Sequence, residues 1–493
     1  MRYIFFNMKD NNYKLGLLRY VYPGIAVFLL VVFFYSMSIG IVSTNDGSHF
    51  ALVNSLVKYG DSKLRDNYRF ALHDSAIYKG ECFADRNPGL AFTLYSFHAI
   101  FKPIEKFLMP VKTDEFSEGK LDDTENRLLA LLLFVPALLG ALFPFLVYYA
   151  LRQMNYDPLI SGIVSVFFLF GTLMIRYSTL LYSHVPAVIL VTIAYFLLFE
   201  FKKRRKIICL SAACFSLSCA VLCEHIIIVL YLPIAVYMLA AGKEFLKPRI
   251  LLAGVISAVL PMIPLLVYDY VNFENPFVIA HMHHSSLKFH ESLSTTFNFS
   301  NVPTHMKLLL VSYSIAEYPF ISLFQSSSFL IFMILLPLLL ILQKRVLRPE
   351  LWICLIGFAI SVTAVCSYDI PIGGYDLDYR HMLFAIPLLC PLFAETLLQA
   401  KGFFEQKGVR YGFPAFLMVL SIFASCSFIT QLEHVRIYLF QEKNSALFYN
   451  FLPGLVNCSI IFTALAILII LAAASFALIK RFTGTTVSGN EKY

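Results

Sequence analysis

Residues 21–50 read VYPGIAVFLLVVFFYSMSIGIVSTNDGSHF, an apolar run followed by a polar one. The apolar part, residues 21–42, carries no charge and is as long as the roughly 20 residues that a helix needs to cross a bilayer. The polar part begins at Ser43 and contains Asp46 and His49. This stretch therefore predicts a membrane span that ends in a loop with several chemically reactive side chains.

The composition of the whole chain agrees with a membrane location. Of 493 residues, 59% are hydrophobic and only 14% are charged, whereas soluble proteins carry about 25% charged residues. This excludes disordered, collagen-like and disulfide-scaffold classes, and also a soluble multidomain enzyme, since so few charged residues could not cover its surface. We expect an all-α polytopic membrane protein.

Twelve spans are expected from apolar stretches of suitable length. They lie at residues 21–42, 127–151, 159–176, 184–200, 207–223, 225–241, 250–268, 318–342, 351–367, 381–399, 412–430 and 453–479. Residues 1–20 then form a cytoplasmic N-terminus, residues 21–480 a transmembrane domain, and residues 481–493 a disordered cytoplasmic tail. The outer loops of note are 43–126, 269–317, 368–380 and 431–452.

The stretch Gly89–Phe101 is too short to cross comfortably and carries His98, so we expect a re-entrant or interfacial helix. With a cytoplasmic N-terminus, this assignment places the basic run Lys202–Lys206, and more than half of the 39 Lys and Arg residues, on the cytoplasmic side. That distribution is the usual one. The net charge of +8 is then explained by cytoplasmic edges beside anionic lipid, and we expect no nucleic-acid partner.

On this map all twelve histidines and most carboxylates fall on the outer side. A transporter with a binding site near the bilayer midplane would instead place polar groups inside the spans. The outer loops are therefore expected to carry the function, in a cell (inner) membrane protein whose site faces the extracytoplasmic side.

Two residues of the first outer loop stand out. Asp46 lies at the boundary between a span and an amphipathic helix that is expected to lie in the interface; it is either a helix cap or a general base whose pKa rises on partial desolvation. Arg86 precedes Pro88 and Gly89 at the start of the short apolar helix. A guanidinium beside a helix N-terminus suits phosphate, although snorkelling or pairing with Asp85 is the alternative.

Three further segments carry polar clusters. The loop Tyr368–His381, with Gly373-Gly374, suits either a sugar-binding rim or a tight polar turn. Glu224-His225 is either a hairpin cap or part of a site. His281, His283, His284 and His290 fit no closed structural zinc site, so we expect no metal ligands; a divalent metal is possible but not supported, and no cofactor is certain.

Several of these motifs resemble the GT-C glycosyltransferases, and most closely the glycosyltransferase family 39-like branch, which includes protein O-mannosyltransferases and the lipid A aminoarabinose transferase. The resemblance rests on the order of the motifs, which extend from the first span to about residue 395. They are Asn45–Val53, Asp74–Gly80, Phe83–Leu90, Gly171–Tyr177, Ser183-His184, Glu224-His225, Phe273–Phe277 and Gly373–His381.

The resemblance implies a GT-C fold with a large first extracytoplasmic loop, and a polyprenyl-phosphate sugar as donor. The acceptor would be a glycan, glycolipid or protein reached from the outer face. Asp46 matches the catalytic aspartate of the family, and Arg86 the residue that contacts the donor phosphate. Substrate-binding residues are expected at Asn45, His49, Asp74, Asp85, Arg86, Tyr177, His184, Glu224, His225, Tyr375, Tyr379, Arg380 and His381.

The expected chemistry is transfer of one sugar with inversion. Arg86, with Arg380, would stabilise the phosphate; Asp46 would remove the proton of the acceptor hydroxyl; Tyr375 and Tyr379 would stack on the sugar. Two other classes stay open. One is a multi-span transporter or flippase, and the other is a polysaccharide polymerase or ligase that uses lipid-diphosphate-linked glycans.

Overall fold

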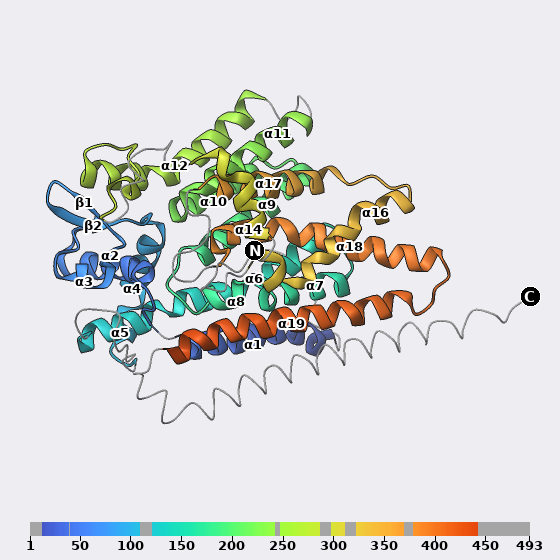
Figure 1. Cartoon of the computed structure of the whole chain (residues 1–493), viewed down its shortest axis with the longest axis horizontal. Coiled ribbons are helices and arrows are strands. Elements are labelled where there is room, and N and C mark those ends of the chain that lie inside the picture. The colour runs from blue at the N-terminus through green and yellow to red at the C-terminus, as the bar shows by residue number, and fades with distance from the viewer. Residues whose placement is uncertain are drawn as a thin grey trace, which may run out of the picture.

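The computed structural model of the chain describes residues 12–38, 40–108, 121–241, 247–285, 297–310, 322–368 and 378–441. Most of these residues form helices that run along the long axis of the molecule, and the elements of the first loop gather at one end of that axis (Figure 1). The predicted span 453–479, the tail 481–493, Tyr375 and His290 lie outside the described residues.

The main helices of the bundle share an apolar composition. They are α1 (Asn12–Ser36), α6 (Phe134–Gln153), α7 (Pro158–Phe170), α9 (His184–Arg204), α10 (Ile207–Cys223), α11 (Tyr231–Ala241), α12 (Pro248–Phe273), α16 (Leu335–Leu342), α17 (Pro349–Ser367), α18 (Ile386–Gln406) and α19 (Gly412–Gln441).

The smaller elements lie between these helices or in the first loop. The first loop holds α2 (Thr44–Tyr59), η1 (Arg65–Asn67), α3 (Tyr68–Ala71), β1 (Ser75–Tyr78), β2 (Glu81–Ala84), α4 (Gly89–Glu105) and α5 (Asp123–Leu132). Elsewhere lie α8 (Met174–Tyr177), η2 (His225–Leu230), η4 (Ala280–His283), η6 (Phe299–Asn301), α14 (Val302–Leu310), α15 (Leu323–Ser326), η7 (Ser328–Ile334) and η8 (Arg380–Ala385). β1 and β2 pair antiparallel, with Ser75 opposite Ala84.

Helices are found where eleven of the twelve spans were predicted, although the span 318–342 is described only from residue 322. Six helical segments of the described chain are long and apolar enough to cross a membrane, and five more apolar helices are shorter. The chain is thus a multi-pass membrane protein, and the count of twelve stays a prediction. The predicted span 159–176 is interrupted, because α7 ends at Phe170 and the short α8 follows.

The helix after the first span, predicted to be amphipathic and interfacial, is packed inside a folded unit of the first loop. The part of α2 from Asn45 to Ser55 is buried all around, and the exposed fraction of Phe50 and Val53 is zero. α3, α4, α5 and β2 cover this helix, so it is the central helix of a folded first-loop unit. Its own apolar residues, together with those of α4 and α5, form a hydrophobic cluster separate from that of the bundle.

The short helix after Arg86 is confirmed as a helix, and its length of 17 residues falls below that of the membrane-crossing segments. Its first residue, Gly89, packs directly on the end of α10: a Cβ at this position would lie 2.5 Å from the carbonyl carbon of Leu222. No side chain fits there without moving backbone. The glycine thus lets the N-terminus of α4 lie against the end of a bundle helix.

The bundle separates the polar loops from the basic residues. α9 begins at His184 beside the first-loop end and finishes in the basic run that includes Lys202 and Arg204. Its 21 residues correspond to a length of about 30 Å. Further basic residues meet carboxylates at the far end, as in the contact of 2.8 Å between Arg348 and Glu395. His184 of the polar cluster and the basic residues Lys202 and Arg204 therefore lie at opposite ends of α9, as the charge pattern predicts.

Candidate active site

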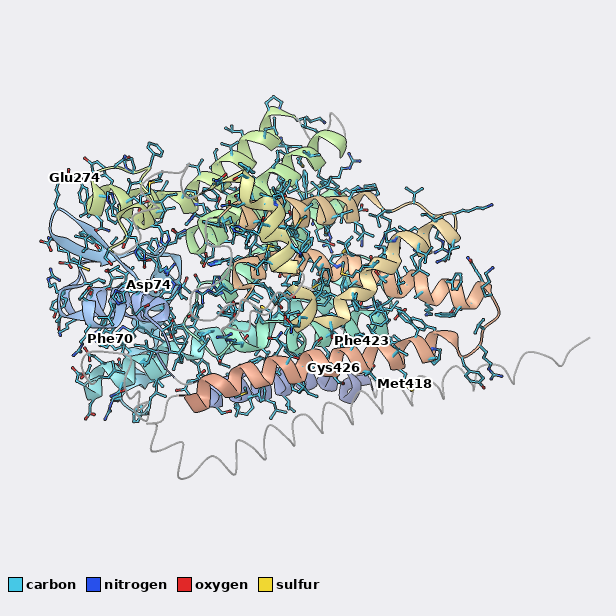
Figure 2. The ribbon with its side chains drawn as sticks, in the orientation of Figure 1. Phe70, Asp74, Glu274, Met418, Phe423 and Cys426 are labelled. Atoms are coloured by element: carbon cyan, nitrogen blue, oxygen red, sulfur yellow. The ribbon has the colours of Figure 1, made fainter. Side chains whose placement is uncertain are left out.

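Arg86 lies at the centre of a buried charged cluster at the base of the first loop. Its Nη2 donates to Asp74 Oδ1 at 2.8 Å, and its Nε lies 3.4 Å from Asp85 Oδ1. Asp74 follows α3 and Asp85 follows β2, so the small hairpin brings the two carboxylates to the same side chain. In Figure 2 Asp74 lies at the same end of the molecule as the hairpin and Glu274.

The electrostatics of this cluster follow from burial and from the shared guanidinium. Burial by itself raises the pKa of Asp74 and of Asp85, but the charge of Arg86 together with hydrogen bonds from neighbouring side chains holds both pKa values below their usual range. The two carboxylates in turn raise the pKa of Arg86 against the opposing effect of burial. All three groups are therefore charged at neutral pH.

The N-terminal part of α2 supplies polar side chains to the same cluster. Thr44 Oγ1 donates to Asp74 Oδ2 at 2.6 Å, and Ser48 Oγ donates to Asp85 Oδ1 at 3.1 Å. His49 is fully buried; burial, with the nearby charge of Arg86, lowers its pKa to about 3. His49 is therefore a neutral imidazole that faces the charged groups.

Asp46 lies on the same helix but serves first as its cap. Its carboxylate accepts hydrogen bonds from the backbone N–H of Val42 and Ser43 at 2.8 Å and from Ser43 Oγ at 2.7 Å. Ser43 Oγ also shares a hydrogen bond of 2.6 Å with the hydroxyl of Tyr182. The capping interpretation is therefore confirmed.

A second polar group forms where α9 and α10 meet. Glu224 Oε1 accepts a hydrogen bond from Ser183 Oγ and lies 3.2 Å from His184 Nδ1, whose ring stacks on Tyr182. Burial raises the pKa of Glu224, against the lowering effect of its bond to Ser183 and of the charges of Arg86 and Arg380. Glu224 and His184 thus belong to one site, as expected.

Asn87 connects the two groups. Its Nδ2 donates to the backbone oxygen of Val221 at 3.1 Å, and its Oδ1 lies 3.3 Å from His225 Nδ1. The other ring nitrogen of His225 lies 3.1 Å from the hydroxyl of Tyr368. The first loop is therefore bound to the C-terminal ends of α10 and α17 directly beside Arg86.

Arg380 completes the site from the last polar loop. Asp378 Oδ1 accepts from the backbone N–H of Arg380 at 3.0 Å, and its Oδ2 accepts from Arg176 and from the hydroxyl of Tyr177, each at 2.9 Å. The guanidinium of Arg380 lies over the ring of Tyr182, 5.4 Å from its centroid. The charge of Arg380 also acts on Arg86, so two cationic side chains face one region.

Three further residues that were predicted to bind substrate, His381, Asn45 and Tyr379, differ in their surroundings. His381 joins the site, since its ring lies 6.0 Å from that of His184. Asn45 is buried in α2. The expected stacking role of Tyr379 is wrong: its ring is fully buried in the bundle core, and its hydroxyl bonds to Ser327 Oγ at 2.9 Å and accepts from the backbone N–H of Leu173 at 3.3 Å.

The structure also brings His281 and His284, which were not predicted as site residues, to Asp85. One nitrogen of His281, one of His284 and a carboxylate oxygen of Asp85 lie within 4.8 Å of one another. The signal in the sequence was the histidine run itself, which lacked an identified carboxylate partner. Asn87, Tyr182 and Tyr368 were not predicted as site residues, although Asn87 and Tyr368 lie in segments that the sequence analysis singled out.

A known protein family matches the part of the chain that holds most of the candidate site. Residues 58–277, less than half of the chain, match the family model of dolichyl-phosphate-mannose-protein mannosyltransferases. This region includes Asp74, Asp85, Arg86, His184 and Glu224 but ends before the segment around Arg380. Among curated protein sequences, none matches this chain.

Among solved structures, the chain is similar to the oligosaccharyltransferase AglB of Archaeoglobus fulgidus in complex with an inhibitory peptide and a dolichol-phosphate. The TM-score is 0.50 at 13% identity, over 85% of this chain and 56% of AglB. A second match is the arabinosyltransferase EmbB of Mycobacterium smegmatis, with a TM-score of 0.44 at 11% identity, over 93% of this chain and 41% of EmbB. The chain thus spans only about half the length of AglB. The expected fold class is confirmed.

Proposed function

We propose that this chain, whose fold is that of the GT-C glycosyltransferases, is a membrane enzyme that transfers a single sugar from a polyprenyl-phosphate donor to an acceptor. The observation that carries the proposal is the position of Arg86. It is held by Asp74 and Asp85 just before the N-terminus of α4, with Arg380 nearby. We propose that the site faces the extracytoplasmic side of a cell membrane.

The surroundings of Arg86 suit a phosphate monoanion or dianion. A helix N-terminus carries partial positive charge, and a guanidinium binds phosphate through two parallel hydrogen bonds. The like charges of Arg86 and Arg380 disfavour each other in the free protein. A phosphate between them would remove this repulsion, and its prenyl chain would extend along the apolar helices of the bundle.

Besides stabilisation of the phosphate, the reaction requires a group that accepts the proton of the acceptor hydroxyl. We propose Asp46 for this role, because it is a buried carboxylate next to the cluster, at the start of α2. Its carboxylate accepts three hydrogen bonds, which fix its orientation. Glu224 is the second candidate, since burial raises its pKa and a base is most effective when its pKa lies close to the working pH.

The reaction is a single displacement. The oxygen of an acceptor hydroxyl forms a bond to the anomeric carbon, and the bond between that carbon and the phosphate oxygen breaks. The leaving polyprenyl phosphate takes the electron pair, which Arg86 and Arg380 stabilise, and the hydroxyl proton passes to the carboxylate. Attack opposite the leaving group inverts the anomeric carbon. Asn45, His49, His184, His225, His381, Tyr177 and Tyr375 are proposed to shape the substrate pocket.

The acceptor is proposed to be a glycan, glycolipid or protein hydroxyl. The match to protein mannosyltransferases supports a protein acceptor in particular. No step of the proposed reaction depends on a nucleotide sugar, so the donor would be made on the cytoplasmic side and presented to the site as a lipid.

The experiment is to incubate the purified protein with labelled polyprenyl-phosphate sugars and acceptor extracts, and to measure free polyprenyl phosphate. We expect release with wild-type protein and with the control variant Lys79→Ala. Lys79 lies on the first loop, as Arg86 does, but its ion pair with Glu274 is exposed. Release should fall at least about 100-fold with Arg86→Ala, the usual scale for a group that stabilises transition-state charge.

The same assay separates the two alternative classes. Turnover of a lipid-diphosphate oligosaccharide, with none of the monophosphate sugar, would identify a polymerase or ligase. Movement of the intact lipid sugar across proteoliposomes without cleavage would identify a flippase. Either result would contradict the proposal.

A further inference from the structure

We propose that Tyr268, Asp269 and Asn272 form a binding site for the hydroxyl groups of a sugar. These three residues, which we call the α12 polar cluster, lie near the C-terminal end of α12 and are not used in the proposed reaction. They are among the few buried residues of this helix. Tyr268 and Asn272 are one helical turn apart and Asp269 follows Tyr268, so all three side chains lie on the side of α12 that packs against the protein.

The carboxyl group of Asp269 is the first observation that points to a ligand. Asp269 is only 5% exposed. Within the described part of the chain, no hydrogen-bond donor and no cation contacts this carboxyl group. A buried carboxyl group is costly unless it is hydrogen-bonded or paired, and ionisable residues in membrane helices usually mark functional sites. Asp269 therefore has its full capacity for hydrogen bonds left for a bound molecule.

The cluster also contains two buried hydrogen-bond donors that are not used by the protein. Among the residues that the structure describes, neither the hydroxyl of Tyr268 nor Nδ2 of Asn272 has a hydrogen-bond partner. Ser62 Oγ donates to Asn272 Oδ1 at 2.6 Å, which fixes the amide so that Nδ2 points elsewhere. The charge of Asp269 acts on Tyr268, so the donors and the carboxyl group are close neighbours.

This combination of groups suits a neutral molecule that carries several hydroxyls. A carboxylate accepts hydrogen bonds through both oxygens, whereas a phenol and an amide nitrogen donate them. Adjacent hydroxyls of a sugar ring can donate to Asp269 and accept from Tyr268 and Asn272. A phosphate group would be repelled by Asp269, and a simple amine would leave both buried donors unpaired, which is costly.

The cluster lies beside the candidate active site. The ring of Tyr268 contacts that of Phe92 in α4 at 6.0 Å between centroids, and the charge of Asp85 acts on Tyr268. Phe273, at the end of α12, contacts Phe83 of β2 at 5.5 Å. The α12 polar cluster is thus next to the elements that hold Arg86.

This position indicates which substrate would use the cluster. Arg86 is proposed to hold the phosphate of the donor, so a sugar bound at the α12 polar cluster would belong to the acceptor. The assignment to the acceptor rests on the proposed function, whereas binding of a sugar does not. Its consequence is that the acceptor is a glycan or a glycolipid rather than an unmodified protein.

Tyr270 provides a matched control on the same helix. It is 61% exposed, so Tyr270→Phe removes a hydroxyl outside the cluster, whereas Tyr268→Phe removes one inside it. Tyr268→Phe and Asp269→Asn are close in shape to the wild type and break no hydrogen bond of the described protein. We therefore expect both variants to fold with a midpoint of thermal unfolding at least as high as that of wild type.

The experiment is saturation-transfer NMR on the full-length protein in a detergent without a sugar head group. The probes are methyl glycosides of common hexoses and pentoses. We expect at least one to bind wild type and Tyr270→Phe with the same Kd. The Kd should rise at least about tenfold in Asp269→Asn and about fivefold in Tyr268→Phe, the usual scale for loss of a charged and of a neutral hydrogen bond.

Two results would overturn the proposal. One is the absence of binding of every glycoside to wild type, or an equal Kd in wild type and Asp269→Asn. The other is binding of phosphoethanolamine in place of a glycoside, lost in Asp269→Asn, which would identify a site for a lipid head group.

The outcome is independent of the transferase assay, because no turnover is required. Arg86→Ala should bind the glycoside as wild type does. Glycoside binding without sugar transfer would support the α12 polar cluster and contradict the proposed function. Sugar transfer without glycoside binding would have the opposite meaning.

Discussion

Arg86 and Asp74 form a hydrogen-bonded ion pair of 2.8 Å in which each side chain is only about one fifth exposed. An ion pair this sheltered from solvent is expected to stabilise the fold by more than a surface ion pair, which usually contributes about 0–1 kcal/mol to stability. Asp74 also accepts from Thr44, so it fixes Arg86 relative to the start of α2.

Replacing Asp74 should therefore weaken donor binding through the position of Arg86. For Asp74→Asn we expect the KM for a polyprenyl-phosphate sugar to rise about tenfold, corresponding to about 1.4 kcal/mol. Steady-state kinetics with varied donor measure this. Lys79→Ala should leave KM unchanged, because that ion pair is exposed. An unchanged KM in Asp74→Asn would mean that Asp74 does not position Arg86.

Asp46 and Glu224 can be separated as bases by comparing two isosteric variants. Asp46→Asn removes the capping charge and should cost about 1 kcal/mol of stability in any case. If Asp46 is the base, kcat should also fall at least about 100-fold, whereas Glu224→Gln should retain most of its activity. The reverse pattern, with a stable and active Asp46→Asn, would reassign the base to Glu224. Thermal unfolding in detergent provides the folding control.

The buried neutral His49 predicts acid sensitivity. Its pKa is lowered to about 3 by burial and by the charge of Arg86, whereas an unfolded histidine titrates near 6.5. Between these values the unfolded chain binds a proton that the folded protein does not, so stability should decline as the pH falls, by up to about 1.4 kcal/mol per pH unit.

Thermal unfolding between pH 7 and pH 4 measures this dependence. The slope should be smaller in His49→Gln than in wild type, and unchanged in His73→Gln, whose side chain is exposed. Equal slopes in wild type and His49→Gln would show that His49 is not held neutral in the folded protein.

The pair of Arg176 and Asp378 should stabilise the end of the bundle that lies beside the first loop. The two side chains are buried, with contact at 2.9 Å, and loss of Asp378 removes a buried charge-assisted hydrogen bond from Arg176. For Asp378→Ala we expect a loss of about 3–5 kcal/mol, seen as a much lower midpoint of thermal unfolding. A midpoint within a degree or two of wild type would contradict this role.

Much of the fold could be predicted from the sequence, because apolar run length alone decides which segments can cross a bilayer. The helix limits of α10 and α17 agree with the prediction to within two residues. The complete burial of α2 could not be predicted: its pattern of apolar residues indicates an amphipathic helix, and only its packing against α4 and α5 shows that it is buried on all sides.

The site was predictable to a similar extent. Arg86, Asp74 and Asp85 follow from the family motifs, and the structure brings them together. Tyr379 was misassigned, since a tyrosine next to a polar loop gives no indication of the direction of its ring. The link from Asp85 to His281 and His284 was out of reach as well, because a contact between distant segments leaves no trace in local spacing.

Arg86 is the residue that is proposed to hold the donor phosphate. Equilibrium binding of a short polyprenyl phosphate to wild type, Arg86→Ala and Lys79→Ala, each shown to be folded and monodisperse, tests this without turnover. We predict that Kd rises at least about tenfold in Arg86→Ala, as loss of a charge-assisted hydrogen bond implies, and stays unchanged in Lys79→Ala. Equal affinity for wild type and Arg86→Ala would contradict the account.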